Sequence, residues 1–375
     1  MKLSTKLGCL VAAGTLACAF AAQAQTQAQT GDAAEIFRGK TVTFFINFTP
    51  GGSTDVEGRV LARHLGAHIP GKPAVIVQNM GGAGGSIGTN YLGQVAKPDG
   101  LTLGYLTASV GKQALGEAEL KVDLRGLEFI GNVPDVNVTY IRTDVPPGIS
   151  VPADIMKTKG FWIGGLTPDS PKDLAERLQL EMLGIEHKYL SGYKGSPEAR
   201  FAVQQNEIQF YNEGLASYRA AIEPGIVKNG TVIPVWYDPL EEGGKLLAAK
   251  AAEGIPARPF HEFYESVKGP GSLPNDLRWQ AYLRINQLST SFLRVLMMPP
   301  KTPPAAVNAM RQALIDTFDD PAYQADAKQT FNNIPEFRSG DAQKAALYGV
   351  LGPRPGVQEF IADYIAKGYR SVGKK

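Results

Sequence analysis

Strand-like and helix-like segments alternate along most of this chain, and that alternation limits the fold more than any other feature of the sequence. Residues 41–47 are mostly β-branched or aromatic and carry no charge, which predicts a buried strand. A turn at residues 50–55 follows, and apolar residues from Val56 to Leu65 then share one face of a predicted helix. Further strands are predicted at residues 74–78, 101–106, 129–133, 136–142, 161–164, 188–190, 208–211 and 231–236, and further helices at 86–95, 172–183, 198–205, 303–318, 320–329 and 357–367. Strands separated by helices pair in parallel through crossover connections, so the pattern predicts an α/β fold.

The length and the order of the segments predict two domains. The chain has 375 residues, and a compact domain usually holds about 100–200. Extended passages near residues 136–142 and 232–237 bracket a self-contained α/β unit, as expected for two lobes joined by two hinges. We therefore expect lobe 1 to contain residues 25–141 and 233–375, and lobe 2 to contain residues 142–232.

Composition excludes several classes of partner. Hydrophobic residues make up 43% of the chain and charged residues 20%, which is ordinary for a globular protein. The formal net charge is only +2, so the sequence offers no field that would hold nucleic acid or an anionic membrane.

The first 24 residues have the features of a signal peptide. Lys2 and Lys6 precede an almost unbroken apolar or small run at residues 7–22, and Ala22-Gln23-Ala24 offers the small residues that a signal peptidase accepts. We expect cleavage after Ala24 and export. Cleavage would remove two lysines and both cysteines, leaving 36 basic and 36 acidic residues and neither a disulfide nor a thiol nucleophile.

Two glycine-rich loops at strand ends carry the functional signal. Gly51 and Gly52 remove side-chain bulk between a predicted strand and a predicted helix, so that backbone N–H groups can approach a ligand. Ser53 and Thr54 add hydroxyl groups, and the helix N-terminus adds partial positive charge. This loop suits an anion, above all a carboxylate, with Asp55 bracing it; an ordinary tight turn with a capped helix is the alternative.

Other chemistry finds less support in the sequence. The second loop, residues 81–88, fits neither the G-x-G-x-x-G nor the G-x-x-x-x-G-K-[ST] pattern, which argues against nucleotides. It does contain G-x-S-x-G around Ser86, so an exported serine hydrolase is the competing interpretation. His64 and His68 are spaced like metal ligands on a helix, but no third ligand is evident, and we expect neither a metal nor a cofactor. A purely structural role would leave the glycine loops unexplained.

Several ordered motifs resemble one known family. Residues 48–55, FTPGGSTD, resemble the PFPPGGSTD signature of Bug-type receptors, which are the solute-binding proteins of tripartite tricarboxylate transporters. Residues 78–88, QNMGGAGGSIG, are similar to the family's ENRPGAGGNIG, and residues 96–103, AKPDGLTL, to its AAPDGYTL. Farther on, YKGSP at 193–197 resembles PYKGSAP, and PPKTP at 299–303 resembles PAGTP.

The resemblance implies a two-lobed periplasmic-binding-protein (Venus-flytrap) fold, with mostly parallel sheets flanked by helices and two hinge strands. It also implies a monomeric receptor, not an enzyme, that passes a small carboxylate solute to the membrane permease subunits of a tripartite tricarboxylate transporter. The residues that it implies as ligand contacts are Thr49, Pro50, Gly51, Gly52, Ser53, Thr54, Gly84, Gly85, Thr107, Thr167, Pro168, Asp169, Ser170 and Asn212.

The chain also departs from the family pattern. Thr49 stands where the family has proline, and Met80-Gly81 stands for Arg-Pro. Asp169 puts negative charge into a loop that is usually small and polar, which would disfavour a second ligand carboxylate there unless a cation intervenes. Residues 238–286 form a longer and poorly matching segment whose role the sequence does not indicate.

Overall fold

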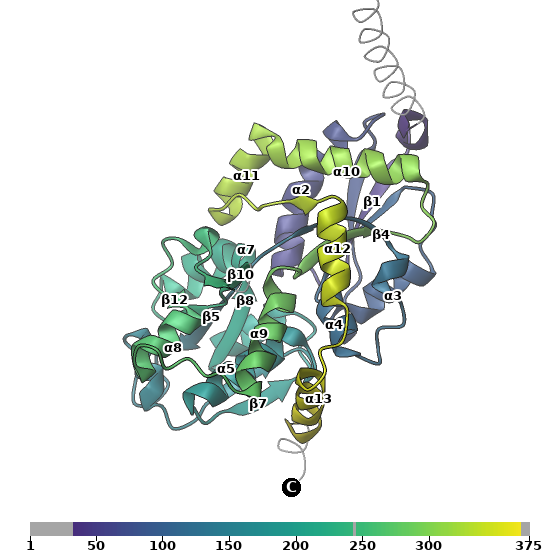
Figure 1. Cartoon of the computed structure of the whole chain (residues 1–375). Coiled ribbons are helices and arrows are strands. Elements are labelled where there is room, and N and C mark those ends of the chain that lie inside the picture. The colour runs from purple at the N-terminus through teal and green to yellow at the C-terminus, as the bar shows by residue number, and fades with distance from the viewer. Residues whose placement is uncertain (1–32, 243–244, 369–375) are drawn as a thin grey trace, which may run out of the picture.

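The computed structural model describes residues 33–242 and 245–368, which fold into two α/β lobes (Figure 1). Each lobe is built around a six-stranded sheet that is packed by helices. The α/β class and the two-lobed architecture predicted from the sequence are confirmed. The predicted signal peptide lies outside the described residues.

Lobe 1 contains the sheet with strand order β14-β4-β13-β3-β1-β2. Its strands are β1 (Thr41–Ile46), β2 (Ala74–Asn79), β3 (Thr102–Thr107), β4 (Glu128–Val133), β13 (Arg294–Met298) and β14 (Arg338–Ser339). Its helices are α2 (Ser53–His68), α3 (Ser86–Gln94), α4 (Ser109–Leu115), α10 (Pro304–Asp319), α11 (Pro321–Phe331) and α12 (Asp341–Val350), with short 3-10 turns η1 (Ala83–Gly85) and η2 (Leu124–Gly126). Strand β1 is parallel to β2 and β3, whereas β13 is antiparallel to β3 and β4.

The central strands of lobe 1 are apolar throughout because helices cover both faces of the sheet. Phe44 packs in the cluster that contains Val60 of α2 and Met310 of α10. Its neighbour Phe45 points to the other face, into the cluster that contains Leu92 of α3 and Leu347 of α12. This double burial explains why residues 41–47 carry no polar alternation.

Lobe 2 contains the sheet with strand order β12-β9-β5-β8-β6-β7. Its strands are β5 (Asn137–Arg142), β6 (Trp162–Gly165), β7 (Lys188–Ser191), β8 (Phe210–Gly214), β9 (Val232–Tyr237) and β12 (Arg258–Pro259). Around the sheet lie α5 (Pro171–Leu183), α6 (Ser196–Gln204), α7 (Leu215–Ser217), α8 (Phe260–Lys268), α9 (Leu277–Thr290) and α13 (Val357–Gly368), the 3-10 turns η3 (Pro152–Lys157) and η5 (Lys250–Ala252), and a π-helix, η4 (Tyr218–Val227). An antiparallel hairpin of β10 (Leu240–Glu242) and β11 (Lys245–Leu247) completes the set.

The chain crosses between the lobes at other places than the expected boundaries at residues 141 and 232. The first crossing lies at residues 134–136, between β4 and β5, and the second at 291–293, between α9 and β13. Strands β5 and β9, expected at the lobe boundaries, pair with each other in the centre of the lobe 2 sheet. Each lobe therefore gains antiparallel pairs from the strands that lead into and out of the crossings.

The described part of the poorly matching segment at 238–286 folds onto lobe 2. It forms the hairpin, η5, β12, α8 and most of α9. Phe260 of α8 is buried against Trp236 of the sheet, with 5.4 Å between the ring centroids. Tyr282 of α9 is buried against Phe260 in turn, with 5.2 Å between the ring centroids. The additional length therefore enlarges the core of lobe 2.

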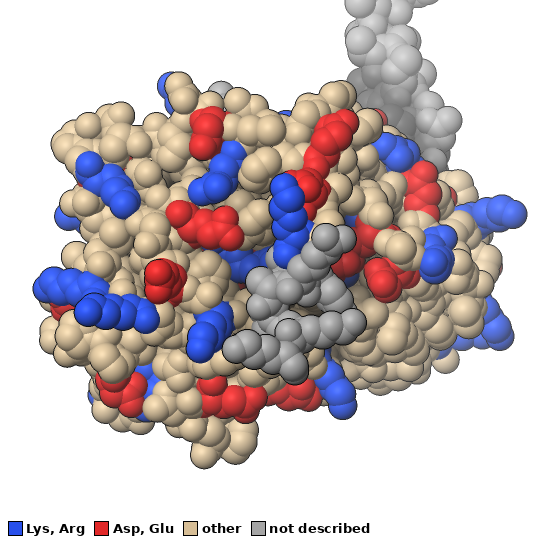
Figure 2. Space-filling model, turned by 90° about the horizontal axis from the view of Figure 1, so that it is seen from below, with Lys and Arg blue, Asp and Glu red and all other residues tan. Residues whose placement is uncertain are grey.

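The charged side chains on the surface alternate in sign. On the face shown in Figure 2, lysines and arginines are interspersed with aspartates and glutamates, and no region of one sign dominates. This agrees with the small net charge. Within the described ranges, no helix has the length and apolar character that crossing a membrane requires.

Candidate functional site

A narrow cavity of about 70 Å³ lies between the two lobes. Lobe 1 lines it at the end of β1 and the start of α2, in the second glycine loop and at the end of β3. Lobe 2 lines it at the start of α5 and α6 and at the end of β8. The lining residues are Phe48, Thr49, Gly52, Ser53, Thr54, Gly84, Thr107, Ala108, Asn137, Leu166, Ser170, Pro171, Lys172, Ser196, Gly214, Leu288, Ser289, Leu293 and Arg294.

The loop from β1 to α2 forms the lobe 1 wall as the sequence predicts. Gly51 has a left-handed φ of 83°, and its N–H donates to Asp55 Oδ2 at 2.8 Å. Arg59 and Asn79 donate to the same carboxylate, so Asp55 braces the loop as expected. Gly52 is the N-cap of α2 and supplies no side-chain cap. The first turn of α2 therefore presents its backbone N–H groups beside the cavity.

The second glycine loop packs closely against the first. A Cβ at Gly85 would lie 2.6 Å from Asn47 Nδ2, so this position requires glycine. Asn47 ties the loop to β3, because its Nδ2 donates to the carbonyls of Gly85 and Thr107 and its Oδ1 accepts from Thr107 N–H. Gly84 lines the cavity, whereas Gly85 supports the loop from behind.

Lobe 2 contributes the N-terminus of α5 and a cation. The Ser170 hydroxyl caps the helix by accepting from Asp173 N–H at 3.3 Å. Lys172 Nζ donates to the Asn212 carbonyl at 3.0 Å and lies 3.6 Å from the centre of the Tyr211 ring. Burial opposes the charge of this ammonium group, but Tyr211 and Asp173 raise the pKa of Lys172 above its usual value. The side chain therefore carries a positive charge at the cavity wall at neutral pH.

Arg294 is a second cation at the wall and is almost fully buried. Its guanidinium lies 2.7 Å from Asp135 and 3.1 Å from Glu57, and Nη2 donates to Ser53 Oγ at 2.7 Å. Burial raises the pKa of the Glu57 carboxyl to about 7, although Arg294 opposes the shift. These charged residues connect the first turns of α2 (Glu57), the first crossing (Asp135) and strand β13 (Arg294).

The lobes touch each other around the cavity. Ser217 N–H of lobe 2 donates to Ser53 Oγ of lobe 1 at 3.3 Å. A Cβ at Gly214 would lie 2.6 Å from the same Ser53 Oγ, and one at Gly195 would overlap Thr49 Oγ1. Glycines thus permit the close approach of the two lobes.

The structure brings together half of the residues implied by the family resemblance. Thr49, Gly52, Ser53, Thr54, Gly84, Thr107 and Ser170 line the cavity. Pro50, Gly51, Gly85, Thr167, Pro168, Asp169 and Asn212 lie in the supporting loops and strands and are not among the lining residues.

The sequence analysis missed both cations at the wall. Lys172 sits on a polar helix start, where a lysine is unremarkable in sequence. Arg294 is the single charge in the apolar run 292–298, and that isolated charge is the signal that could have drawn attention to it.

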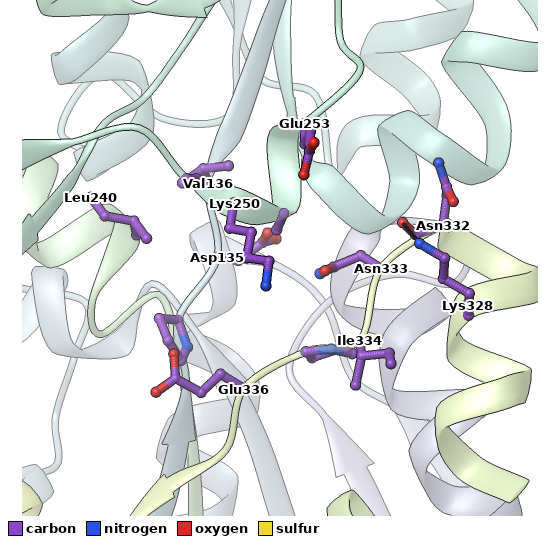
Figure 3. Close-up of a pocket in the computed structure, with 14 residues that line it drawn as sticks. Asp135, Val136, Leu240, Lys250, Glu253, Lys328, Asn332, Asn333, Ile334 and Glu336 are labelled. Carbon is purple, nitrogen blue, oxygen red and sulfur yellow. Dashed lines mark hydrogen bonds between the residues drawn. The ribbon is translucent and has the colours of Figure 1, made fainter. Parts of the chain in front are cut away.

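A larger cavity of about 510 Å³ lies at the first crossing, apart from the glycine loops (Figure 3). Lys250 of lobe 2 and Asn333 of lobe 1 point into it from opposite walls. Asp135 lines this cavity and also pairs with Arg294, which lines the narrow cavity between the lobes, so this ion pair lies between the two cavities.

The serine hydrolase interpretation finds no support in the geometry. Ser86 is 1% exposed, and its Oγ has no hydrogen-bond partner among the described residues. His187, one of two downstream histidines that a triad could use, forms its hydrogen bond with the Ile185 carbonyl at 3.1 Å. His64 and His68, the pair with metal-ligand spacing, contact Asp326 and Asp320 at α11 and the turn before it. No histidine of the described chain is therefore bonded to Ser86 as a general base would be.

Comparison of the sequence with characterised proteins finds two partial relatives, while no protein-family model matches the chain. Protein BugT of Bordetella pertussis is 41% identical over 112 residues, which are 28% of this chain and 33% of BugT. A UPF0065 protein from the gbd 5′ region of Cupriavidus necator is 32% identical over 206 residues, which are 52% of this chain and 58% of that protein. The chain thus spans from one third to under two thirds of the length of these relatives.

Solved structures show the same fold over most of the chain. Periplasmic binding protein BugD has a TM-score of 0.62 at 19% identity, covering 89% of this chain and 99% of BugD. Rpa4515 of Rhodopseudomonas palustris with adipate has 0.61 at 17% identity, covering 88% and 97%. MatC of the same organism with bound malate has 0.58 at 14% identity, covering 89% and 99%. The chain is thus similar in sequence to BugT over part of its length and shares the fold of BugD over most of it.

Proposed function

We propose that this protein is a periplasmic solute-binding receptor, not an enzyme, and that it encloses a small carboxylate-bearing solute between its lobes. The observation that carries the proposal is the convergence of three helix N-termini on one cavity. Gly52, Ser170 and Gly195 are the N-caps of α2, α5 and α6, and residues of each first turn line the wall. Unpaired N–H groups and the positive end of the helix dipole favour an anion at such a position.

Two further observations support an anionic solute. Lys172 and Arg294 add positive charge at the wall, one from each lobe. MatC and Rpa4515, which share the fold, were solved with malate and with adipate. The lobe contacts exclude water from the enclosed ligand, and hydrogen bonds to charged groups strengthen when water is excluded.

The same proposal covers location and partners. We infer export to the periplasm from the signal-peptide pattern, and transfer of the solute to the permease of a tripartite tricarboxylate transporter from the family. The receptor would act as a monomer and would use neither a metal nor a cofactor to hold the solute. Pull-down of the cognate permease subunits with the solute-loaded receptor would test the transfer step.

A thermal-shift screen tests the binding function directly. Malate, adipate and other mono-, di- and tricarboxylates are compared with their uncharged amides at several concentrations. A ligand at 100 times its Kd stabilises the folded state by about 2.7 kcal/mol, which raises Tm by several degrees. A rise with acids but not with amides supports the proposal, and no rise with any acid contradicts it.

Gly52→Val locates the anion site. The nearest atoms to an added Cβ at Gly52 are 3.9 Å away, so the loop accommodates the first carbon. The two methyl groups would occupy the space in front of the α2 amides. We expect this variant to keep its Tm without ligand to within a few degrees and to lose the acid-induced rise. A variant that binds acids normally would show that this loop is not the anion site.

A further inference from the structure

Three carboxylates from the two lobes meet beside the solute cavity. Glu117 and Glu119 follow α4 in lobe 1, and Asp169 precedes α5 in lobe 2. One oxygen from each lies within 4.8 Å of the others. Lys112 connects this cluster to the cavity, because a Cβ on the lining residue Gly84 would lie 3.0 Å from Lys112 Nζ.

Glu117 has an unused ligand atom. The residue is 9% exposed, and its Oε2 forms an ion pair with Lys112, which is 1% exposed. Its Oε1 is buried and has no hydrogen-bond partner among the described residues. A buried carboxylate oxygen without a donor is costly, and in native proteins such an atom usually contacts a water molecule or an ion.

The charges of the cluster do not balance within the described chain. Glu119 and Asp169 form no ion pair and accept no side-chain or backbone hydrogen bond through their carboxylates in the part that the structure describes. Lys112 neutralises one of the three carboxylates, which leaves two negative charges.

We propose that Glu117, Glu119 and Asp169 bind a divalent cation, best matched by Ca²⁺, that links the two lobes in their closed arrangement. Two charges on the cation match the two unbalanced charges of the cluster. The three oxygens all lie within 4.8 Å of one another, which is close enough for one cation to contact them. Ca²⁺ takes about 6–8 oxygen ligands in flexible geometry, whereas Mg²⁺ demands a near-ideal octahedron, so carboxylates that come from two lobes suit Ca²⁺ better. The cation would also offset the negative charge of Asp169 next to an anionic solute.

The wild-type protein tests the site without any solute. After treatment with EDTA and dialysis, the full chain is titrated with CaCl₂ by isothermal calorimetry, with NaCl at matched ionic strength as the control. Three side-chain ligands, one of them exposed, predict half-saturation at about 0.1–1 mM, in the range of weak extracellular Ca²⁺ sites. We also expect CaCl₂ at 10 mM to raise Tm by about 1–3 °C more than matched NaCl does. Absence of saturable heat up to 10 mM CaCl₂ would overturn the proposal.

Asp169→Asn tests whether both lobes contribute. This change leaves the size of the side chain unaltered and should weaken Ca²⁺ binding at least tenfold, while Glu119→Gln should weaken it severalfold. Glu186→Gln changes the net charge equally at an exposed position of lobe 2 and should leave the titration unchanged. Equal Ca²⁺ affinity of Asp169→Asn and the wild type would refute a cation shared by the lobes. A failure of the carboxylate screen would leave this result unaffected, because the titration needs no solute.

Discussion

Ser53 takes part in both the anion loop and the contact between the lobes. Its Oγ accepts from Arg294 Nη2 at 2.7 Å and from Ser217 N–H at 3.3 Å. The loop motif identified Ser53 from the sequence, because glycines and hydroxyl residues that are adjacent in sequence between a strand and a helix indicate an anion-binding loop. Arg294 could not be identified in this way, since its partners Glu57 and Asp135 are distant in sequence and only the fold brings them together.

Gly214→Ala should impair closure without unfolding the protein. An added Cβ would lie 2.6 Å from Ser53 Oγ and 3.0 Å from Arg294 Nη2, and both groups belong to lobe 1. The φ of −59° at Gly214 suits alanine, so lobe 2 itself should accept the change. Overpacking of this kind costs about 1–3 kcal/mol, which corresponds to roughly a 5- to 150-fold weaker affinity for the carboxylate found in the screen.

Calorimetric titration measures the effect of Gly214→Ala on affinity. Gly349→Ala on α12 is the control, because an added Cβ there meets no atom within 4 Å. If both variants bind as tightly as the wild type, then the lobes do not close through the contact between Gly214 and Ser53.

At the scale of elements, the sequence was most informative where a periodic pattern ends in turn residues. The end of β1 lies within one residue of its predicted position and α2 starts three residues before Val56, because Gly51 and Gly52 separate two clear periodicities. Strand β13 was not predicted, because periodicity does not assign so short an apolar run to a strand or a helix, and this run begins with the charged Arg294. The lobe boundaries also differ, because the pairing of β5 with β9 is a long-range contact without a local signature.

The contact between α2 and β13 predicts a pH dependence of stability. Burial raises the pKa of Glu57 on α2 from 4.5 to about 7, so between these values the folded state binds more protons than the unfolded state. The contribution of Glu57 to the free energy of unfolding therefore falls as the pH rises through this range. A shift of this size corresponds to at most about 3 kcal/mol. The free energy of unfolding of Glu57→Gln should accordingly fall less than that of the wild type between pH 5 and pH 8.

Urea unfolding at four pH values between 5 and 8 measures this difference. The histidines contribute equally to both proteins, so the comparison cancels their titration. Exposed Glu186 provides the control substitution, Glu186→Gln, whose profile should follow the wild type. Parallel profiles for Glu57→Gln and the wild type would show that Glu57 titrates alike in the folded and unfolded states.

At the scale of the whole molecule, the chain connects the lobes three times. After the crossings at 134–136 and 291–293, the segment 351–356 leads from α12 on lobe 1 to α13 beside lobe 2 (Figure 1). Val357 and Ile361 of α13 are buried in the same cluster as Leu178 and Tyr282 of lobe 2, and Tyr364 donates to Glu181 at 2.7 Å. The last helix was predicted from its periodicity, but the lobe that it joins was not, because an amphipathic face does not identify its partner.

Ile361→Ala tests whether α13 is part of the lobe 2 core. Ile361 is 2% exposed, and truncation of such a side chain to alanine usually lowers the free energy of unfolding by about 2–5 kcal/mol. Asp363→Ala on the same helix removes only an exposed pair with Lys367 and should change stability by less than about 0.5 kcal/mol. Urea unfolding followed by tryptophan fluorescence reports on lobe 2, where Trp162, Trp236 and Trp279 all lie.

Since α13 also connects lobe 2 to α12, loosening of α13 in Ile361→Ala should allow the lobes to open further. Small-angle X-ray scattering would detect this opening as a larger radius of gyration. Wild-type stability and radius in Ile361→Ala would mean that the third connection does not hold the lobes together.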